Sequence, residues 1–340
     1  MSVVAPAPAA LPRLHDVLAD ELEDRLGHDV PTGLWRRALI DPVTELTRRP
    51  GKEVRARLCE LAWGLGGGHG PVPEPVTLTI EALHAGSLII DDVEDDARER
   101  RGAPALHLLV GVPLAINTGS WLYFWALDRL ASLELPAAVQ LAMHQAAIRA
   151  LLACHQGQAL DLAVRVDELE HGRVGAVTAA ITAGKTACLI GLAMRLAALA
   201  AGAPPARVAA IARLGEDLGT GLQMLDDLGG LGRARRDKGL EDLRAARATW
   251  PWAWLAEAAD DLTWSRLQHR LRLARERADA GDGELEAIAS ALRHEIETVG
   301  RTRVRTTLDQ GFARALAALG DGPHLRALEG ELRCLEESYG

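Results

Sequence analysis

Apolar residues recur every three or four positions along most of this 340-residue chain, which is the period of an amphipathic α-helix. The pattern predicts helices over 11–26, 33–47, 52–65, 114–133, 136–164, 168–184, 185–201 and 205–228. A further helix is expected to start near 75 and to lead into an acidic stretch. Residues beyond 238 are also predicted to be helical, with breaks at 281–283 and 320–323.

Glycine, proline and charged residues interrupt this pattern and predict the connections between helices. Loops are expected at 66–71, 102–113 and 229–238, and a disordered tail at 1–10. The sequence has no repeat at a fixed period, no heptad run and no linker between domains. We therefore expect residues 11–340 to form a single all-α domain.

Composition narrows the possible classes of protein. Aromatic residues make up only 4% of the chain, which favours helices over sheets, and the net charge of −9 argues against non-specific binding to nucleic acid. The four cysteines fit no zinc-binding spacing and are expected to be thiols in a reducing cytoplasm. The most apolar stretch, 187–202, is interrupted by Arg195, and the N-terminus has no basic segment typical of a signal peptide. We expect a cytoplasmic protein without a membrane span.

An acidic stretch directly follows the apolar run at 83–90. Residues 91–96 contain five acids, and Asp91 and Asp95 share a helix face, where like charges destabilise a helix by about 0.2–0.5 kcal/mol per pair. A hard divalent cation such as Mg²⁺ removes that cost and leaves coordination positions for phosphate oxygens. Arg100 and Arg101 could bind the same phosphates. The pattern therefore favours a magnesium-diphosphate site over a solvated acidic helix end.

A second acid pair, Asp226-Asp227, ends another long apolar helix. Alone it would be typical of a solvated helix terminus, but two carboxylate clusters on two long helices could hold a metal-diphosphate cluster between them. Lysines at breaks in the pattern add to this interpretation. Lys52 lies one helical turn before Arg55, Lys185 lies among apolar residues where a cation needs an anion, and Lys238 follows the second acid pair. Each of these lysines alone could equally be a solvated side chain.

The order of these motifs resembles one family, the trans-prenyl diphosphate synthases, and within it the geranylgeranyl diphosphate synthases most. The motifs are Gly51-Lys52-x-x-Arg55, His84 seven residues before Asp91, Asp91-Asp92-x-x-Asp95, Arg100-Arg101-Gly102, Gly157-Gln158-x-x-Asp161, Lys185-Thr186, Gln223-x-x-Asp226-Asp227 and Lys238. The resemblance implies a bundle of long antiparallel helices around a deep central cavity, in a homodimer. It also implies condensation of isopentenyl diphosphate with an allylic diphosphate (dimethylallyl, geranyl or farnesyl).

The resemblance also implies roles for individual residues. Asp91 and Asp95 would ligate two Mg²⁺ ions with Asp92 in support, and Asp226, next to Asp227, would ligate a third. The residues implied to hold the allylic diphosphate are Arg100, Lys185, Gln223 and Lys238, with Thr186 beside them. Those implied to hold isopentenyl diphosphate are Lys52, Arg55, His84 and Arg101. On the sequence alone, His84 would more often be a core histidine.

Product length is expected to depend on residues that face the cavity upstream of Asp91. Gly86 and Ser87 stand where short-chain enzymes of this family carry bulky aromatic residues, so they would not block elongation past fifteen carbons. Trp121 and Phe124, at i and i+3, could close the cavity further down, although some aromatics of this segment are expected to be core residues. A twenty-carbon product is predicted.

Two positions depart from the pattern of this family, and two alternative functions are considered. The acid or asparagine usual at the fifth position of the second motif is Gly230, and Arg247 stands near where the family often has lysine. A class I terpene cyclase, or a prenyltransferase with another acceptor, shares the first acid motif. A non-catalytic regulatory subunit is the second alternative, although such subunits typically lose an acid cluster.

Overall fold

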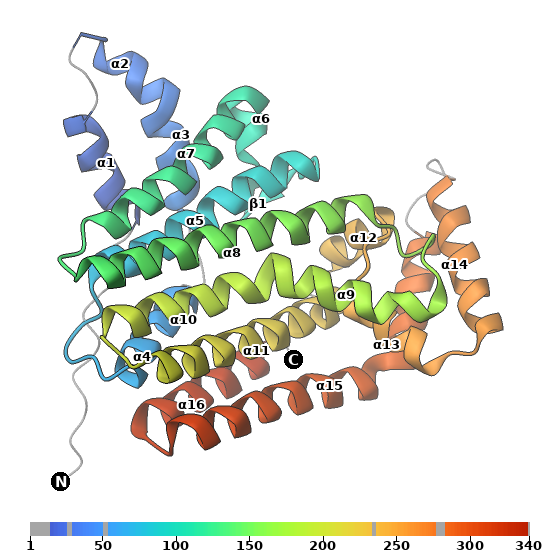
Figure 1. Cartoon of the computed structure of the whole chain (residues 1–340). Helices are drawn as coiled ribbons and strands as arrows, with labels where there is room; N and C mark the ends of the chain where they lie inside the picture. Colours follow the sequence, from blue (N-terminus) through green and yellow to red (C-terminus); the bar gives the residue numbers. More distant parts are fainter. Residues whose placement is uncertain (1–13, 26–28, 50–53, 233–235, 277–282, 339–340) are drawn as a thin grey trace. The chain divides into compact units, whose positions relative to one another are not determined.

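The computed structural model describes residues 14–25, 29–49, 54–232, 236–276 and 283–338, and these are almost entirely helical (Figure 1). The predicted all-α class is confirmed. The predicted tail at 1–10 and the predicted break at 281–282 fall outside the described residues. The chain divides into two compact units, and the boundaries fall inside three helices, α8 (Ala137–Ala163), α10 (Cys188–Ala200) and α11 (Pro205–Gly230). The single-domain organisation stays a prediction.

Unit 1 comprises Met1–Ala147 and Ala193–Val208. Its other elements are α1 (Leu14–Arg25), α2 (Thr32–Trp35), a π-helical turn η1 (Arg36–Ile40), α3 (Asp41–Thr47), α4 (Val54–Leu65), α5 (Glu74–Glu94), β1 (Glu99–Arg100), β2 (Ala103–Pro104), α6 (Leu106–Val110) and α7 (Val112–Ala131). The main packing in this unit is between α5 and α7, which lie side by side (Figure 1).

Two glycines allow α5 and α7 to cross with their backbones in contact. A Cβ atom at Gly86 would lie 2.8 Å from the carbonyl oxygen of Gly119, and a Cβ at Gly119 would lie 2.9 Å from the side chain of Ile90. Thr79, fully buried on α5, donates a hydrogen bond of 3.1 Å to the carbonyl of Ala126 on α7. The close crossing gives the C-terminal end of α5 a fixed position on α7.

Unit 2 comprises Ile148–Leu192 and Ala209–Gly340. Its other elements are a 3₁₀ turn η2 (His171–Arg173), α9 (Val174–Thr182), a π-helical turn η3 (Ala183–Ala187), α12 (Arg236–Arg244), α13 (Trp250–Ala258), α14 (Asp261–Glu276), α15 (Gly283–Leu319) and α16 (Pro323–Ser338). Helix α13 packs against α9 and α15. Its Trp252 and Trp254 are fully buried, and the ring of Trp252 meets Trp264 edge-on at 5.9 Å. The tryptophan-rich segment is therefore core packing.

Three predicted connections differ from the structure. The predicted loop at 229–238 is too long, because α11 continues to Gly230 and α12 begins at Arg236. The predicted loop at 102–113 contains a hairpin and the five-residue helix α6, which is too short to produce a periodic pattern. The predicted separation of helices at 184 and 185 is absent, because η3 joins α9 to α10 without a break. The predicted break at 320–323 is confirmed between α15 and α16.

Two helical stretches, Ala137–Ala163 and His171–Ala200, are long and apolar enough to cross a membrane by length and composition alone. Core helices of soluble proteins pass the same criterion, and 56% of the apolar window in the second stretch is buried. The absence of a membrane span and the cytoplasmic location stay predictions.

We expect Gly119→Ala to lower the free energy of unfolding by about 1–3 kcal/mol, because the new methyl group overpacks the crossing of α5 and α7. A matched control is Gly330→Ala in α16, where a Cβ atom would meet nothing within 4 Å. This control should stabilise the helix by about 0.5–1 kcal/mol, because alanine has the higher helix propensity. Urea denaturation of both variants measures the difference, and equal effects would contradict the proposed crossing.

Candidate active site

The first acid cluster lies at the C-terminal end of α5. Asp91 is in the last turn, Asp95 is the residue that caps the helix, and the side chain of Asp92 is only 1% exposed. The C-terminal end of a helix carries a partial negative charge, so carboxylates are unfavourable there without cations. The cluster therefore requires positive charge from another part of the chain or from a ligand.

Arg100, on β1, supplies part of that charge. Its Nε donates a hydrogen bond of 2.7 Å to Oδ1 of Asp92, a second guanidinium nitrogen bonds the same oxygen, and Oδ2 of Asp91 lies 3.4 Å away. Burial raises the pKa of Asp92 against the opposing effect of Arg100. Burial alone would lower the pKa of Arg100, but its bond to Asp92 raises it on balance. Oδ2 of Asp92 is buried and has no hydrogen-bond partner in the described part of the chain.

A tight hairpin orients the two arginines. Arg101 and Gly102 form the two-residue turn between β1 and β2, and both have positive φ (54° and 78°), as a type I′ turn requires. Arg49 donates hydrogen bonds to the carbonyls of Arg100 (2.8 Å) and Pro104 (2.9 Å), and thereby ties the hairpin to the end of α3. Arg49 was not predicted from the sequence, since a lone arginine at a predicted helix end has no distinctive pattern.

Basic residues gather around His84 on α5. Burial and then the charges of Arg55, Arg101 and Arg100 hold the pKa of His84 well below its usual range, so the imidazole is neutral at pH 7. The structure thus brings together, within unit 1, four of the residues that the sequence predicted to bind diphosphate. Lys52 lies outside the described residues.

The residues expected to set chain length lie on α5 and α7. Gly86 packs against Gly119 at the crossing of the two helices, and Ser87 donates a hydrogen bond of 2.8 Å to the carbonyl of His84. Trp121 is half-buried, whereas Phe124 is 72% exposed. Trp125, which stacks on Trp121, is a core residue of this unit. Their influence on product length stays a prediction.

The second acid cluster lies near the C-terminal end of α11, in unit 2. Asp227 is buried, and its two oxygens accept hydrogen bonds from Nε2 of Gln223 (2.6 Å) and from the backbone N–H of Trp250 (3.0 Å). Burial raises the pKa of Asp227 to about 6, although these bonds oppose the shift. Thr186 on η3 donates a bond of 2.7 Å to the carbonyl oxygen of the Gln223 side chain, and so fixes which way that amide points.

Helix α12 adds a cation and a further acid to this cluster. Lys238 forms an ion pair with Asp226. Burial would lower the pKa of Lys238, but Asp226 and Asp242 raise it on balance. Burial and the neighbouring acids raise the pKa of Asp242 to about 7, although Lys238 opposes the shift. Asp242 was not predicted from the sequence, where its only signal is its spacing of one helical turn after Lys238.

Lys185 lies at a third position of the unit 2 cluster. Its Nζ is 2.8 Å from Oδ2 of Asp161 on α8, and Arg247 lies 3.6 Å from the same oxygen. The lysine among apolar residues thus has an acidic partner, as its environment requires. The residues described here in unit 2 thus include four carboxylates and three cations: Asp161, Asp226, Asp227 and Asp242, and Lys185, Lys238 and Arg247.

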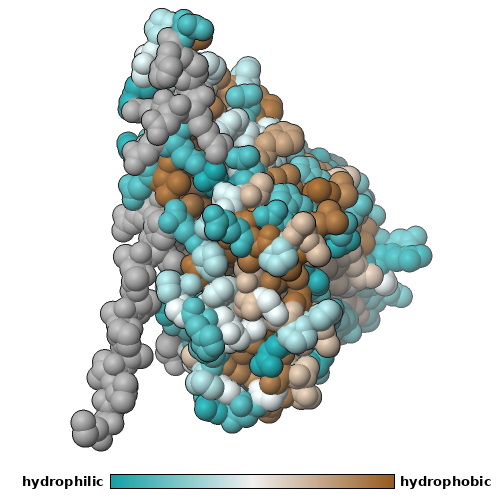
Figure 2. All heavy atoms as spheres, turned by 60° about the vertical axis from the view of Figure 1, so that its left-hand side comes forward, coloured by the Kyte–Doolittle hydropathy of each residue, from teal (hydrophilic) through white to brown (hydrophobic). Residues whose placement is uncertain are grey.

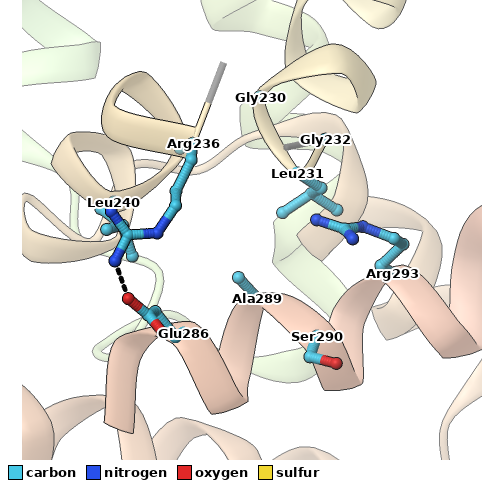
Figure 3. Close-up of a pocket in the computed structure, with 10 residues that line it drawn as sticks. Gly230, Leu231, Gly232, Arg236, Leu240, Glu286, Ala289, Ser290 and Arg293 are labelled. Atoms are coloured by element: carbon cyan, nitrogen blue, oxygen red, sulfur yellow. Dashed lines mark ion pairs between the residues drawn. The ribbon is translucent and has the colours of Figure 1, made fainter. Parts of the chain in front are cut away.

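Close backbone contact joins α11 to α12. A Cβ atom at Gly239 would lie 2.0 Å from the carbonyl oxygen of Gly230, whereas a Cβ at Gly230 would lie 3.7 Å from Gly239. Beside this contact is a pocket of about 160 Å³ (Figure 3). An ion pair between Arg236 and Glu286 ties α12 to α15 there, and Arg293 extends from α15 towards Leu231 (Figure 3). The glycine at the fifth position of the second motif thus lies where the two helices touch.

The donor atoms of both clusters suit a hard cation. They are carboxylate oxygens, which Mg²⁺ prefers, and the buried Oδ2 of Asp92 has a lone pair that nothing in the described residues uses. Within those residues, no three His, Cys, Asp or Glu side chains are arranged to hold a metal ion. Arg100 and Lys238 contact the carboxylates instead. The carboxylate oxygens are suitable ligands for a magnesium ion, but Arg100 and Lys238 would have to move away from them before the ion could bind.

Comparison with known proteins identifies the family. A family model described as polyprenyl synthetase matches residues 36–288. A geranylgeranyl pyrophosphate synthase 2 from Zymoseptoria tritici is 33% identical over 226 residues, which is 63% of each chain. A geranylgeranyl pyrophosphate synthase from Mucor circinelloides f. lusitanicus is 37% identical over 128 residues, 36% of this chain and 39% of the relative. The matched region is thus less than two thirds of the length of these curated relatives.

Solved structures show the same fold. A decaprenyl diphosphate synthase from Rhodobacter capsulatus superposes with a TM-score of 0.75 at 24% identity, over 96% of this chain and 99% of the other. A geranylgeranyl pyrophosphate synthase from Lactobacillus brevis gives 0.73 at 24% identity, over 95% and 96%. The predicted resemblance is confirmed at the level of family and fold.

The raised pKa of Asp242 predicts a pH-dependent stability. Between about pH 4 and pH 7 the folded protein holds a proton that the unfolded chain has lost, so the free energy of unfolding falls as the pH rises through this range. Asp242→Asn removes this loss. In metal-free buffer, we expect the variant to melt above the wild type at pH 8, and we expect this difference to shrink as the pH falls towards 4. Asp237→Asn, a control on the same helix at a side chain that is 96% exposed, should show no such difference.

A Cβ atom has no room at Gly239 but has room at Gly230, so we expect the two positions to differ in their tolerance of alanine. Gly239→Ala must push α12 away from α11, so we expect a loss of about 1–3 kcal/mol in the free energy of unfolding. Faster hydrogen exchange in α12 should accompany this loss. Gly230→Ala is expected to leave both quantities near wild type. Hydrogen-exchange mass spectrometry measures this difference. Similar exchange in the two variants would show that the backbones of α11 and α12 are further apart than the structure has them.

Proposed function

The chain belongs to the polyprenyl synthetase family, and from this membership we propose that it is a trans-prenyltransferase. The proposed reaction joins isopentenyl diphosphate to an allylic diphosphate (dimethylallyl, geranyl or farnesyl) and yields a longer linear prenyl diphosphate. One observation carries the proposal. Each unit has a carboxylate cluster near the C-terminal end of a long helix, and each cluster has basic side chains close to it.

Magnesium is the proposed cofactor, with three ions per active site. Asp91 and Asp95 would hold two ions with the support of Asp92, and Asp226, beside Asp227, would hold the third. When bound, the metal supplies Lewis-acid stabilisation of the departing diphosphate. Arg100 and Lys238, which pair with these acids, would turn to the diphosphate oxygens once the metal takes over the carboxylates.

The basic side chains divide into two proposed groups. The group for the allylic diphosphate is Arg100, Lys185, Gln223 and Lys238, with Thr186 positioning the Gln223 amide. The group for isopentenyl diphosphate is Lys52, Arg55, His84 and Arg101. A neutral His84 donates a hydrogen bond without adding to the repulsion among the arginines. The side chains thereby stabilise the charge of the leaving group, and no nucleophilic side chain takes part.

A twenty-carbon product is proposed. The names of the fungal relatives specify geranylgeranyl pyrophosphate synthases. No large side chain stands at Gly86 or Ser87. Phe124 is 72% exposed, so Trp121 is the proposed floor. The glycine at 86 also has a packing role at the α5–α7 crossing.

A homodimer is proposed from the exposed apolar side chains. In unit 2, Ile148 and Leu152 are exposed one helical turn apart on α8. In unit 1, Leu141 on α8 and Ile116 and Phe124 on α7 are exposed. Figure 2 shows apolar side chains at the surface between polar ones. Exposed apolar side chains favour association, and a second copy of this chain is the proposed partner. No nucleic acid or membrane partner is proposed.

We expect purified protein with Mg²⁺ to consume isopentenyl diphosphate in the presence of dimethylallyl, geranyl or farnesyl diphosphate. Linear products should end at twenty carbons, because no bulky side chain stands at Gly86 or Ser87 and Trp121 is the proposed floor. Mass spectrometry of the products measures both points. Loss of allylic substrate to hydrocarbon or alcohol without uptake of isopentenyl diphosphate would contradict the proposed reaction. As a matched pair, Asp226→Asn should lose about 10²–10³-fold in kcat, and the exposed Asp237→Asn should keep it.

Trp121→Ala tests the proposed floor of the cavity. Removal of the indole should lengthen the product by at least one five-carbon unit, because the growing chain gains room. The variant is assayed with farnesyl diphosphate, and Trp125→Phe serves as the control. In the wild type, the Trp125 side chain is held in the core by a hydrogen bond to Glu21. An unchanged product from Trp121→Ala with normal turnover would place the floor elsewhere.

A further inference from the structure

Two cysteines meet in unit 2 next to the proposed diphosphate site. Sγ of Cys154 on α8 lies 3.2 Å from Sγ of Cys188, the first residue of α10, and no disulfide joins them. Both side chains are half-buried. The sequence interval of 34 residues gave no sign of this contact, and the proposed prenyl transfer makes no use of either sulfur.

Glycines explain why the two sulfurs come so close. A Cβ atom at Gly157 would lie 2.5 Å from the backbone nitrogen of Lys185, and one at Gly184 would lie 2.7 Å from Cα of Gly157. The backbones of α8 and η3 therefore touch, at less than the usual distance of about 8–10 Å between helix axes. Cysteine side chains are short, and a disulfide needs Cα atoms within about 4.4–6.8 Å. The glycine contact lies one helical turn from each cysteine and provides such an approach.

The environment gives the two sulfurs different roles. Cys188 donates a hydrogen bond of 2.6 Å to the carbonyl of Gly184. The hydrogen bond with Cys154, and then burial, raise the pKa of the Cys188 thiol far above its ordinary value. Because the S–H of Cys188 is held by the carbonyl of Gly184, the exchange is taken to begin at Cys154.

We propose that Cys154 and Cys188 are a dithiol modification site that reacts with a small disulfide to form a reversible intramolecular disulfide between α8 and α10. The Cys154 thiolate attacks one sulfur of the small disulfide, forms a mixed disulfide and releases one small thiolate. Cys188 gives its proton to the released thiolate and attacks Sγ of Cys154, which expels the second small thiolate. The protein loses two electrons and two protons, and the small disulfide becomes two thiols.

The location gives the disulfide a structural consequence. Asp161 follows Cys154 on α8, Lys185 precedes Cys188 on η3, and these two residues form the 2.8 Å ion pair. A bond between the sulfurs would fix the segments that carry this pair. The proposed disulfide is independent of the proposed prenyl transfer, so it is tested by disulfide formation and melting temperature, without an activity assay.

The test uses the full chain, equilibrated with oxidised glutathione and then alkylated and digested with trypsin. Cys154 and Cys188 fall in separate tryptic peptides, 150–165 and 186–195. We expect the thiol count to fall from four to two, with these two peptides joined in one product that reductant separates. The oxidised protein should melt several degrees above the reduced protein, because the cross-link restricts the unfolded chain.

Matched variants separate this site from the other cysteines. Cys59→Ser, at a buried cysteine of unit 1, should still form the joined peptide. Cys154→Ser and Cys188→Ser should each abolish both the joined peptide and the rise in melting temperature, and Cys154→Ala repeats the test if the serine variant fails to fold. Retention of four thiols, a cross-link to another cysteine, or glutathione held on Cys154 without closure would each overturn the proposal.

Discussion

Carboxylates at helix ends must be neutralised, and this requirement determines which residues surround both acid clusters. Asp91 and Asp92 lie in the last turn of α5, and Asp226 and Asp227 lie near the end of α11, where the partial charge of the helix is already negative. Each pair is stable only with cations beside it, and the fold brings Arg100 and Lys238 to these positions. The same requirement makes each pair suited to a hard metal ion and, through that ion, to a diphosphate.

Glycine contacts determine where those cations and acids lie. Gly86 and Gly119 set the crossing of α5 and α7, Gly157 and Gly184 bring α8 against η3, and Gly239 meets the carbonyl of Gly230 where α12 begins. Each contact lies within a few residues of a proposed ligand residue: His84, Lys185 and Lys238, respectively. Backbone contact leaves no side chain to adjust, so positions set in this way are more precise than those set by flexible side chains.

Much of this could be predicted from the sequence, because helical periodicity and acidic helix ends are local signals. The long helices and the all-α class were predicted in that way, the family was predicted from the resemblance of the ordered motifs, and these predictions are confirmed. The short helix α6 has too few residues for a period. The hairpin depends on positive φ at Arg101, a conformation that Gly, Asn or Asp would signal and arginine does not. Arg49 and Asp242 were missed because their roles depend on contacts far apart in sequence: Arg49 bonds a carbonyl 51 residues away. The roles of the site residues in binding and chain length stay predictions.

The central claim is that these acid clusters bind diphosphate through a divalent cation. Thermal melting of the full chain with Mg²⁺, with inorganic pyrophosphate, and with both together tests it directly, because a ligand of the native state must raise the melting temperature. The account predicts a clear rise with both together, little with either alone, and loss of the rise in Asp91→Asn. An equal rise with pyrophosphate alone would assign binding to the basic residues, and no rise with both would contradict the claim.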